Sequence, residues 1–84
     1  MNGRFAVSTA GHDVGEVYII VGTGEDVVFL ANGINRTVAK PKGKNRKHVE
    51  LSDKMPDAAI KELIAKGCGD EAIRQAIHHY KKGK

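Results

Sequence analysis

Residues 10–21, AGHDVGEVYIIV, combine a polar turn flanked by glycines with an apolar strand that follows it directly. Gly11 and Gly15 allow backbone angles with positive φ, which other residues adopt only with strain. Asp13 lies between them and is able to accept hydrogen bonds from the local backbone, which would fix the turn. Alternate side chains of residues 17–21 point to opposite faces of a strand. Because both sets are largely apolar, we expect a central strand that is buried on both sides.

Short runs of apolar residues predict further strands on both sides of this one. Asn32-Gly33 is a strong signal for a two-residue hairpin turn, and the glycines and acids of residues 22–26 favour another turn. The expected strands cover residues 4–8, 16–21, 27–31, 35–39 and 49–51. Four or five short strands with tight turns predict a small SH3-like β-barrel over about residues 4–51.

The sequence pattern changes from strands to helices after Ser52. Pro56 suits the first turn of a helix, which Gly67 would end, and Asp70 suits the N-cap of a second helix. The second helix carries an apolar stripe, formed by Ile73, Ala76, Ile77 and Tyr80. We expect two helices within about residues 56–82, which complete a single domain spanning residues 1–84. The stripe either belongs to the core of this domain or docks on a partner protein.

The positive charge of the chain is concentrated in one segment, residues 40–48. The 84 residues carry a net charge of +4, and the isoelectric point is about 9.4. Five cationic side chains lie in this segment, which contains no acid: Lys40, Lys42, Lys44, Arg46 and Lys47. Removing these five charges leaves −1 for all other residues. Several cations on a conformable segment are what RNA phosphates require, because affinity comes largely from counterion release. The alternative is a solvated loop that is basic for solubility.

Enzymatic and metal-binding functions find little support in the sequence. The chain contains no evident catalytic arrangement and no metal-ligand spacing such as CxxC, and His78 and His79 are adjacent rather than one helical turn apart. We therefore expect no enzyme, no cofactor and no metal. The single Cys68, the absence of a secretory signal and the absence of about 20 consecutive apolar residues favour a cytoplasmic protein without a membrane partner.

The glycine turn, the two strands after it and the basic segment together resemble a KOW motif. The resemblance rests on residues 8–21 and residues 27–33 and extends over residues 4 to about 51. It is strongest to KOW proteins of the eukaryotic and archaeal large ribosomal subunit. Bacterial members carry another glycine shortly after the turn, where Val17 and Tyr18 stand here. The resemblance implies an SH3-like fold, and a role in translation as a protein that binds ribosomal RNA.

The resemblance also implies which residues lie near RNA. Gly11 and Gly15 would shape the turn, with His12 and Asp13 as its exposed tip, although a plain structural turn needs the same residues. The five cations of residues 40–48 would contact phosphates, with His48 as a hydrogen-bonding neighbour and Arg36 holding the register. The alternative function is a protein-interaction module that docks on a ribosome or transcription component through the barrel edge or the helical stripe. We expect a monomer when the protein is free.

Overall fold

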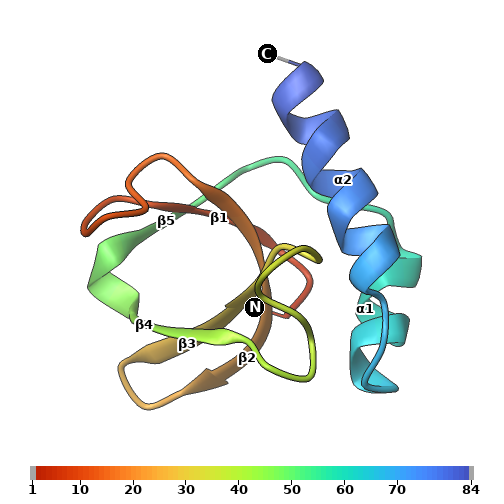
Figure 1. Cartoon of the computed structure of the whole chain (residues 1–84), viewed down its shortest axis with the longest axis horizontal. Coiled ribbons are helices and arrows are strands. Elements are labelled where there is room, and N and C mark those ends of the chain that lie inside the picture. Colours follow the sequence, from red (N-terminus) through yellow and green to blue (C-terminus); the bar gives the residue numbers. More distant parts are fainter. Residues whose placement is uncertain (1, 84) are drawn as a thin grey trace.

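The computed structural model describes residues 2–83, which form a five-stranded antiparallel sheet followed by two helices (Figure 1). The order of strands in the sheet is β4-β3-β2-β1-β5. Along the chain, the elements are β1 (Phe5–Ser8), β2 (Val17–Gly24), β3 (Val27–Ala31), β4 (Lys42–Asn45), the short 3-10 helix η1 (Arg46–His48), β5 (Val49–Leu51), α1 (Ala58–Ala65) and α2 (Asp70–Lys82). None of the helices within residues 2–83 is long and apolar enough to cross a membrane.

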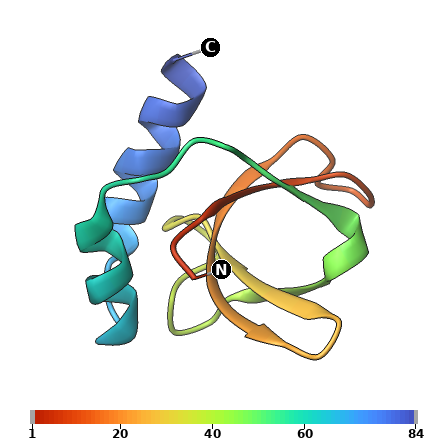
Figure 2. The same ribbon diagram turned by 180° about the vertical axis from the view of Figure 1, so that it is seen from behind.

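The sheet is strongly curled, and both helices lie on its convex side (Figures 1 and 2). The ladder does not close, because β4 and β5 form its two edges and share no pairing among the described residues. The helix η1 connects these two edge strands. The mixed β and α composition that the sequence predicts is thus confirmed, with the sheet open at the junction between β4 and β5.

The central strand β2 contributes side chains to two separate cores, because its residues alternate between the two faces of the sheet. The inner core lies within the curl and consists of Ala6, Tyr18, Ile20, Val28 and Leu30. The outer core lies between the sheet and the helices and consists of Phe5, Val17, Ile19, Ala31, Ile60, Ile64, Ile73, Ile77 and Tyr80. Burying one large aliphatic side chain contributes about 1.5–3 kcal/mol, so both cores are needed to stabilise a chain of this length.

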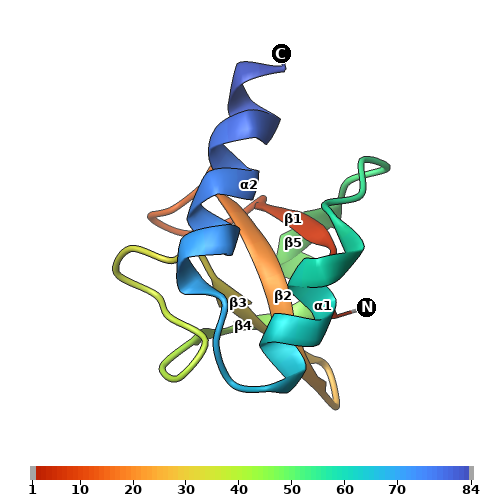
Figure 3. The same cartoon turned by 90° about the vertical axis from the view of Figure 1, so that its right-hand side faces the viewer.

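The helical stripe predicted from the sequence packs on the sheet of the same chain. Ile73, Ile77 and Tyr80 are all at most 8% exposed, and α2 crosses the outer face of β2 (Figure 3). The helix α1 begins after Asp57, whose carboxylate accepts a hydrogen bond from the Ala59 backbone N–H at 2.9 Å. The apolar stripe is therefore core, and of the two alternatives the docking face is excluded.

The predicted fourth strand over residues 35–39 is wrong, because β4 forms later, at Lys42–Asn45. Asn32-Gly33 does not make a two-residue hairpin but begins a loop over residues 32–41. The Asn32 side-chain oxygen accepts hydrogen bonds from the N–H groups of Ile34 and Arg36, which folds the loop on itself. Gly33 has φ +77° and lies so close to α2 that a Cβ there would collide with a backbone oxygen. Tertiary contact with the helix thus overrides the local hairpin signal.

Two smaller expectations also need correction. The second strand continues beyond residue 21 to Gly24, so that only Glu25 and Asp26 remain in the hairpin turn, where Asp26 has φ 60°. Asp70 begins α2, but its carboxylate does not cap the helix. It instead accepts a hydrogen bond from the Val38 N–H at 2.8 Å and holds the loop of residues 32–41 against α2.

Candidate nucleic-acid interface

The loop between β1 and β2 is a tight turn closed by backbone hydrogen bonds. Ser8 donates its N–H to Glu16 at 3.0 Å, and Gly15 donates back to Ser8 at 2.9 Å. Gly11 and Gly15 both have φ +90°, which confirms the positive φ expected of the two glycines. Glu16 also donates its N–H to the Asp13 carbonyl oxygen at 2.9 Å. The backbone of the loop is thereby fixed, and with it the direction of the Asp13 side chain.

The Asp13 side chain is the centre of a hydrogen-bonded ion cluster. It is 12% exposed, and each of its oxygens accepts two hydrogen bonds of 2.8 Å: Oδ1 from Ser8 Oγ and Lys44 Nζ, and Oδ2 from the Tyr18 hydroxyl and Lys42 Nζ. The hydrogen bonds from Lys42 and then Lys44 hold the pKa of Asp13 far below its usual value, although burial opposes this shift. We call these five residues the Asp13 cluster.

Burial, together with the bond to Asp13, raises the pKa of Tyr18. Burial raises the pKa of Tyr18 to about 12, and the hydrogen bond to Asp13 with the charges of Asp13 and Glu16 adds to the increase. The positive charge of Arg36 acts in the opposite direction. Arg36, which is exposed, therefore lies within electrostatic range of this cluster although it belongs to the loop of residues 32–41.

Strand alternation explains why two cations of the basic segment point inward. Lys42 pairs with Leu30 and Lys44 pairs with Val28, and these partners belong to the inner core. Directly paired residues of adjacent strands project to the same face, so both lysines enter the curl beneath the Gly11–Gly15 loop. Lys44 Nζ also donates a hydrogen bond of 2.8 Å to the Ala10 carbonyl oxygen.

The Asp13 cluster corrects two expectations about the site. The basic segment has a neutralising acid, Asp13, which is 29 and 31 residues away in sequence from the lysines it pairs with. Asp13 itself does not form the exposed tip of its loop. The residues on either side of it, His12 and Val14, are exposed, and Val14 is 61% exposed. The contribution of Lys42 and Lys44 is thus mainly to hold the loop on β4.

The remaining cations of the basic segment are exposed, and the end of η1 lies beside the same loop. Lys40, Arg46, Lys47 and His48 are all exposed. The Asn45 side chain accepts the Lys47 N–H at 2.9 Å and so caps η1, and the His48 carbonyl oxygen accepts the Thr9 N–H at 2.9 Å. The end of β1, the glycine loop and η1 are therefore neighbours, which brings the two stretches singled out in the sequence to one end of the sheet.

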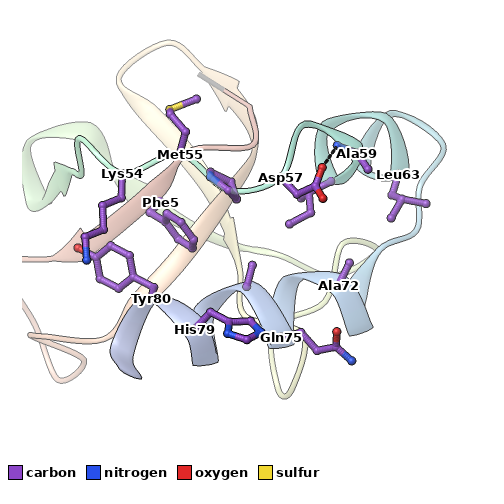
Figure 4. Close-up of a pocket in the computed structure, with 13 residues that line it drawn as sticks. Phe5, Lys54, Met55, Asp57, Ala59, Leu63, Ala72, Gln75, His79 and Tyr80 are labelled. Carbon is purple, nitrogen blue, oxygen red and sulfur yellow. Dashed lines mark hydrogen bonds between the residues drawn. The ribbon is translucent and has the colours of Figure 1, made fainter. Parts of the chain in front are cut away.

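A separate groove of about 470 Å³ lies between α1, α2 and the segment that precedes α1 (Figure 4). Apolar groups dominate its lining, among them Phe5, Met55 and Leu63. Its carboxylate, Asp57, is already engaged in capping α1. Within residues 2–83, no group of three or more His, Cys, Asp or Glu side chains is arranged to hold a metal ion.

Sequence reasoning missed Ser8 and Tyr18 as partners of Asp13, and it missed the pairing of Asp13 with the two lysines. One signal was present: Lys42 and Lys44 are two residues apart, which places both on one face if the segment is a strand. Pro41 and Gly43, which are residue types that disfavour the interior of a strand, hid this signal. The chain matches no protein-family model, and no curated protein matches it significantly.

Proposed function

We propose that this chain is a non-enzymatic RNA-binding protein of the KOW type, and that its curled sheet is an SH3-like barrel. Its RNA-binding surface comprises the exposed cations Arg36, Lys40, Arg46 and Lys47 together with His48 and the His12 tip of the Gly11–Gly15 loop. Asp13, Lys42 and Lys44 form the internal clamp that joins this loop to β4. The partner is ribosomal RNA, bound in the cytoplasm by a protein that is monomeric when free.

The observation that supports this proposal most strongly is the attachment of the glycine loop to the basic segment. Asp13 receives both Lys42 and Lys44 at 2.8 Å, and Thr9 and His48 are joined through their backbones. The exposed loop tip and the exposed cations of η1 then lie near one another, next to the Asp13 cluster, in which the two lysines neutralise the acid at the centre of the loop. Phosphate contacts need this combination of positive charge and fixed backbone, which sets the register of a bound strand.

Lys42 and Lys44 are paired with Asp13, so three of the five cations of the segment remain to contact phosphates. Arg36 adds a fourth cation. Each contact with single-stranded RNA contributes about −0.7 to the slope of log K against log salt concentration, so four contacts give about −2.8. Fluorescence anisotropy with a structured ribosomal RNA fragment and a random single strand, over a salt series, measures this slope. A preference for the structured fragment supports a ribosomal partner.

The variant Lys40→Gln/Arg46→Gln/Lys47→Gln tests the proposed surface. We expect this variant to weaken the salt dependence of binding, from a slope of about −2.8 to about −0.7, because only the phosphate contact of Arg36 remains. The matched control is Lys61→Gln/Lys66→Gln/Lys81→Gln, which removes the same charge from exposed positions in α1, at its C-terminal end and in α2. It should keep the slope of the original protein. Equal losses in both variants would indicate nonspecific attraction, and binding that neither variant weakens would refute the surface.

The alternative, a protein-interaction module, retains one of its two proposed surfaces. The helical stripe is buried within the chain, but β4 and β5 are edge strands of an open sheet. An exposed strand edge is able to pair with an extended segment of another protein. Nuclease treatment before a pull-down distinguishes the two functions, because partners held through RNA are lost and partners held by a strand edge remain.

A further inference from the structure

The dipeptide Asn-Gly occurs twice in the chain, as Asn2-Gly3 and Asn32-Gly33. This dipeptide is prone to deamidation, because a glycine has no Cβ to hinder attack by its backbone nitrogen on the preceding side chain. The glycine nitrogen forms a bond to the asparagine Cγ, and its proton leaves with the side-chain nitrogen as ammonia. Water then opens the cyclic imide at one of its two carbonyl carbons, which gives aspartate or isoaspartate. Each dipeptide is therefore a reactive site unless the fold prevents the attack.

The loop of residues 32–41 holds the side-chain amide of Asn32 at both ends. Oδ1 of Asn32 accepts hydrogen bonds from the N–H groups of Ile34 and Arg36, at 2.9 and 3.0 Å. Nδ2 of Asn32 donates a hydrogen bond of 2.8 Å to Oδ1 of Asn35. Attack by the Gly33 nitrogen makes Cγ tetrahedral and expels Nδ2, so the side chain has to leave this position. The reaction therefore competes with three hydrogen bonds of the folded loop.

The attacking nitrogen is held as well, because Gly33 is packed against α2. The Gly33 N–H donates a hydrogen bond of 3.0 Å to the Arg36 carbonyl oxygen, and Arg74 Nη1 donates one of 3.3 Å to the Gly33 carbonyl oxygen. Gly33 is buried, and a Cβ there would collide with the Asp70 carbonyl oxygen. The peptide group of Gly33 is therefore restrained from turning toward the Asn32 side chain while the loop lies on the helix. Detachment of the loop from α2 removes this restraint.

We propose that Asn32 is a deamidation site that is closed while the loop of residues 32–41 is docked on α2 and reactive when the loop detaches. This inference goes beyond RNA binding and does not depend on it. The isoaspartate product adds one carbon to the main chain between positions 32 and 33, which moves Gly33 out of its tight contact with α2. The loop then no longer docks in the same way, so the reaction makes a transient detachment permanent. The aspartate product keeps the length of the main chain and the acceptor oxygen, so it leaves the loop docked.

The test is incubation at mildly alkaline pH, of folded protein and of protein in guanidinium chloride, followed by trypsin digestion and mass spectrometry. Trypsin cleaves after lysine and arginine, so Asn2 and Asn32 fall on separate fragments, residues 1–4 and 5–36. The rate in the folded protein is the unfolded rate multiplied by the fraction of open loop, so we expect Asn32 to react at least about tenfold more slowly when folded. In denaturant both sites should react, with Asn2 as the reference. Equal rates at Asn32 in the two states, or no reaction there in denaturant, would overturn the proposal.

The variant Arg74→Ala weakens the docking of the loop without altering the Asn32 amide. We expect it to accelerate deamidation of Asn32 in the folded protein by about 2- to 10-fold, the effect of losing one hydrogen bond from the docked state. In denaturant it should have no effect. Lys81→Ala is the matched control, because it removes the same charge from an exposed position of α2. Thermal unfolding of both variants verifies that they fold, and a rate in Arg74→Ala no higher than in Lys81→Ala would contradict the role of α2.

Limited trypsin digestion of refolded protein measures whether the detachment is permanent, because Arg36 is exposed and lies in the loop. Protein that carries isoaspartate at position 32 should be cleaved after Arg36 faster than the variant Asn32→Asp, whose main chain has the original length. The unaltered protein and Asn32→Asp should be cleaved at similar rates. If the protein with isoaspartate is as resistant as Asn32→Asp, the loop docks again after the reaction and the proposed permanence is refuted.

Discussion

Replacing Asp13 with asparagine tests the ion cluster directly, because the amide keeps the shape of the side chain but not its charge. Each carboxylate oxygen accepts one bond from a hydroxyl and one from a lysine. In either amide orientation, the NH2 group would face one of the two lysines, which has no acceptor to offer. A hydroxyl can rotate to accept, but either Lys42 loses its bond to residue 13 or Lys44 loses that bond and keeps only the Ala10 carbonyl oxygen.

The cost of this loss follows from how far each lysine is from water. The Lys44 side chain is 10% exposed and the Lys42 side chain 28%. Breaking a fully buried ion pair costs about 3–5 kcal/mol, and the partial exposure of Lys42 lets this side chain relax into solvent. We therefore expect Asp13→Asn to lower the free energy of unfolding by about 2–3 kcal/mol. A domain of this size has a total stability on the order of 4–13 kcal/mol, so the loss is a large share.

Urea unfolding followed by circular dichroism measures this difference. With a slope of about 1–2 kcal/mol per molar urea, the midpoint should fall by roughly 1–3 M. Glu16→Gln is the matched control, because Glu16 is exposed at the same loop and loses the same charge, with an expected change within about 0.5 kcal/mol. If Asp13→Asn is no less stable than Glu16→Gln, the Asp13 cluster does not hold the loop and the reasoning is refuted.

Three further predictions concern the same structure. The pKa of Asp13 is lower in the folded than in the unfolded protein, so the stabilising contribution of this carboxylate is complete above about pH 4 and is lost as the pH falls below that value. The difference in stability between the original protein and Asp13→Asn should therefore become smaller when unfolding is measured at acid pH. Tyr18→Phe removes one hydrogen bond to Asp13 and should cost about 1 kcal/mol in urea unfolding; a cost of zero would mean that the bond is absent in solution. Gly33→Ala, which collides with α2, should destabilise the protein by at least about 1 kcal/mol more than Gly15→Ala, which has positive φ but no atom within 4 Å; equal thermal shifts would contradict the close approach.

Local patterns predicted most of the elements, because these elements depend on residues close in sequence. The alternation of residues 17–21 identified β2, and the apolar run at residues 27–31 gave β3 with its observed bounds. The helical stripe at Ile73 and Ile77 identified the buried side of α2. The SH3-like barrel stays a prediction, since the curl of a sheet depends on how distant edges meet rather than on the period of any one strand.

The position of β4 could not be derived from local signals because long-range contacts determine it. Asn32-Gly33 favours a short hairpin by itself, but Gly33 is packed against α2, about 40 residues later in the sequence. Asp70, at the start of α2, accepts the Val38 N–H and anchors the same loop. The chain between β3 and the next strand is therefore drawn toward the helix, and β4 forms only beyond Pro41.

The prediction of the candidate site was affected because the sequence analysis treated residues 40–48 as a loop without a strand. In such a loop, all five cations would be available to contact phosphates. Once residues 42–45 form a strand, its two faces have different consequences. Inward, Lys42 and Lys44 reach Asp13 and fix the Gly11–Gly15 loop. Outward, Gly43 lies beside the Phe29 ring, and Phe29 is 37% exposed. Because lysines alternate with small or polar residues in β4, the inner face of this edge strand forms ion pairs with Asp13, and its outer face lies beside an exposed aromatic ring. With Arg36 counted in both cases, a salt slope of about −2.8 for four contacts, rather than about −4.2 for six, distinguishes this strand from a disordered basic loop.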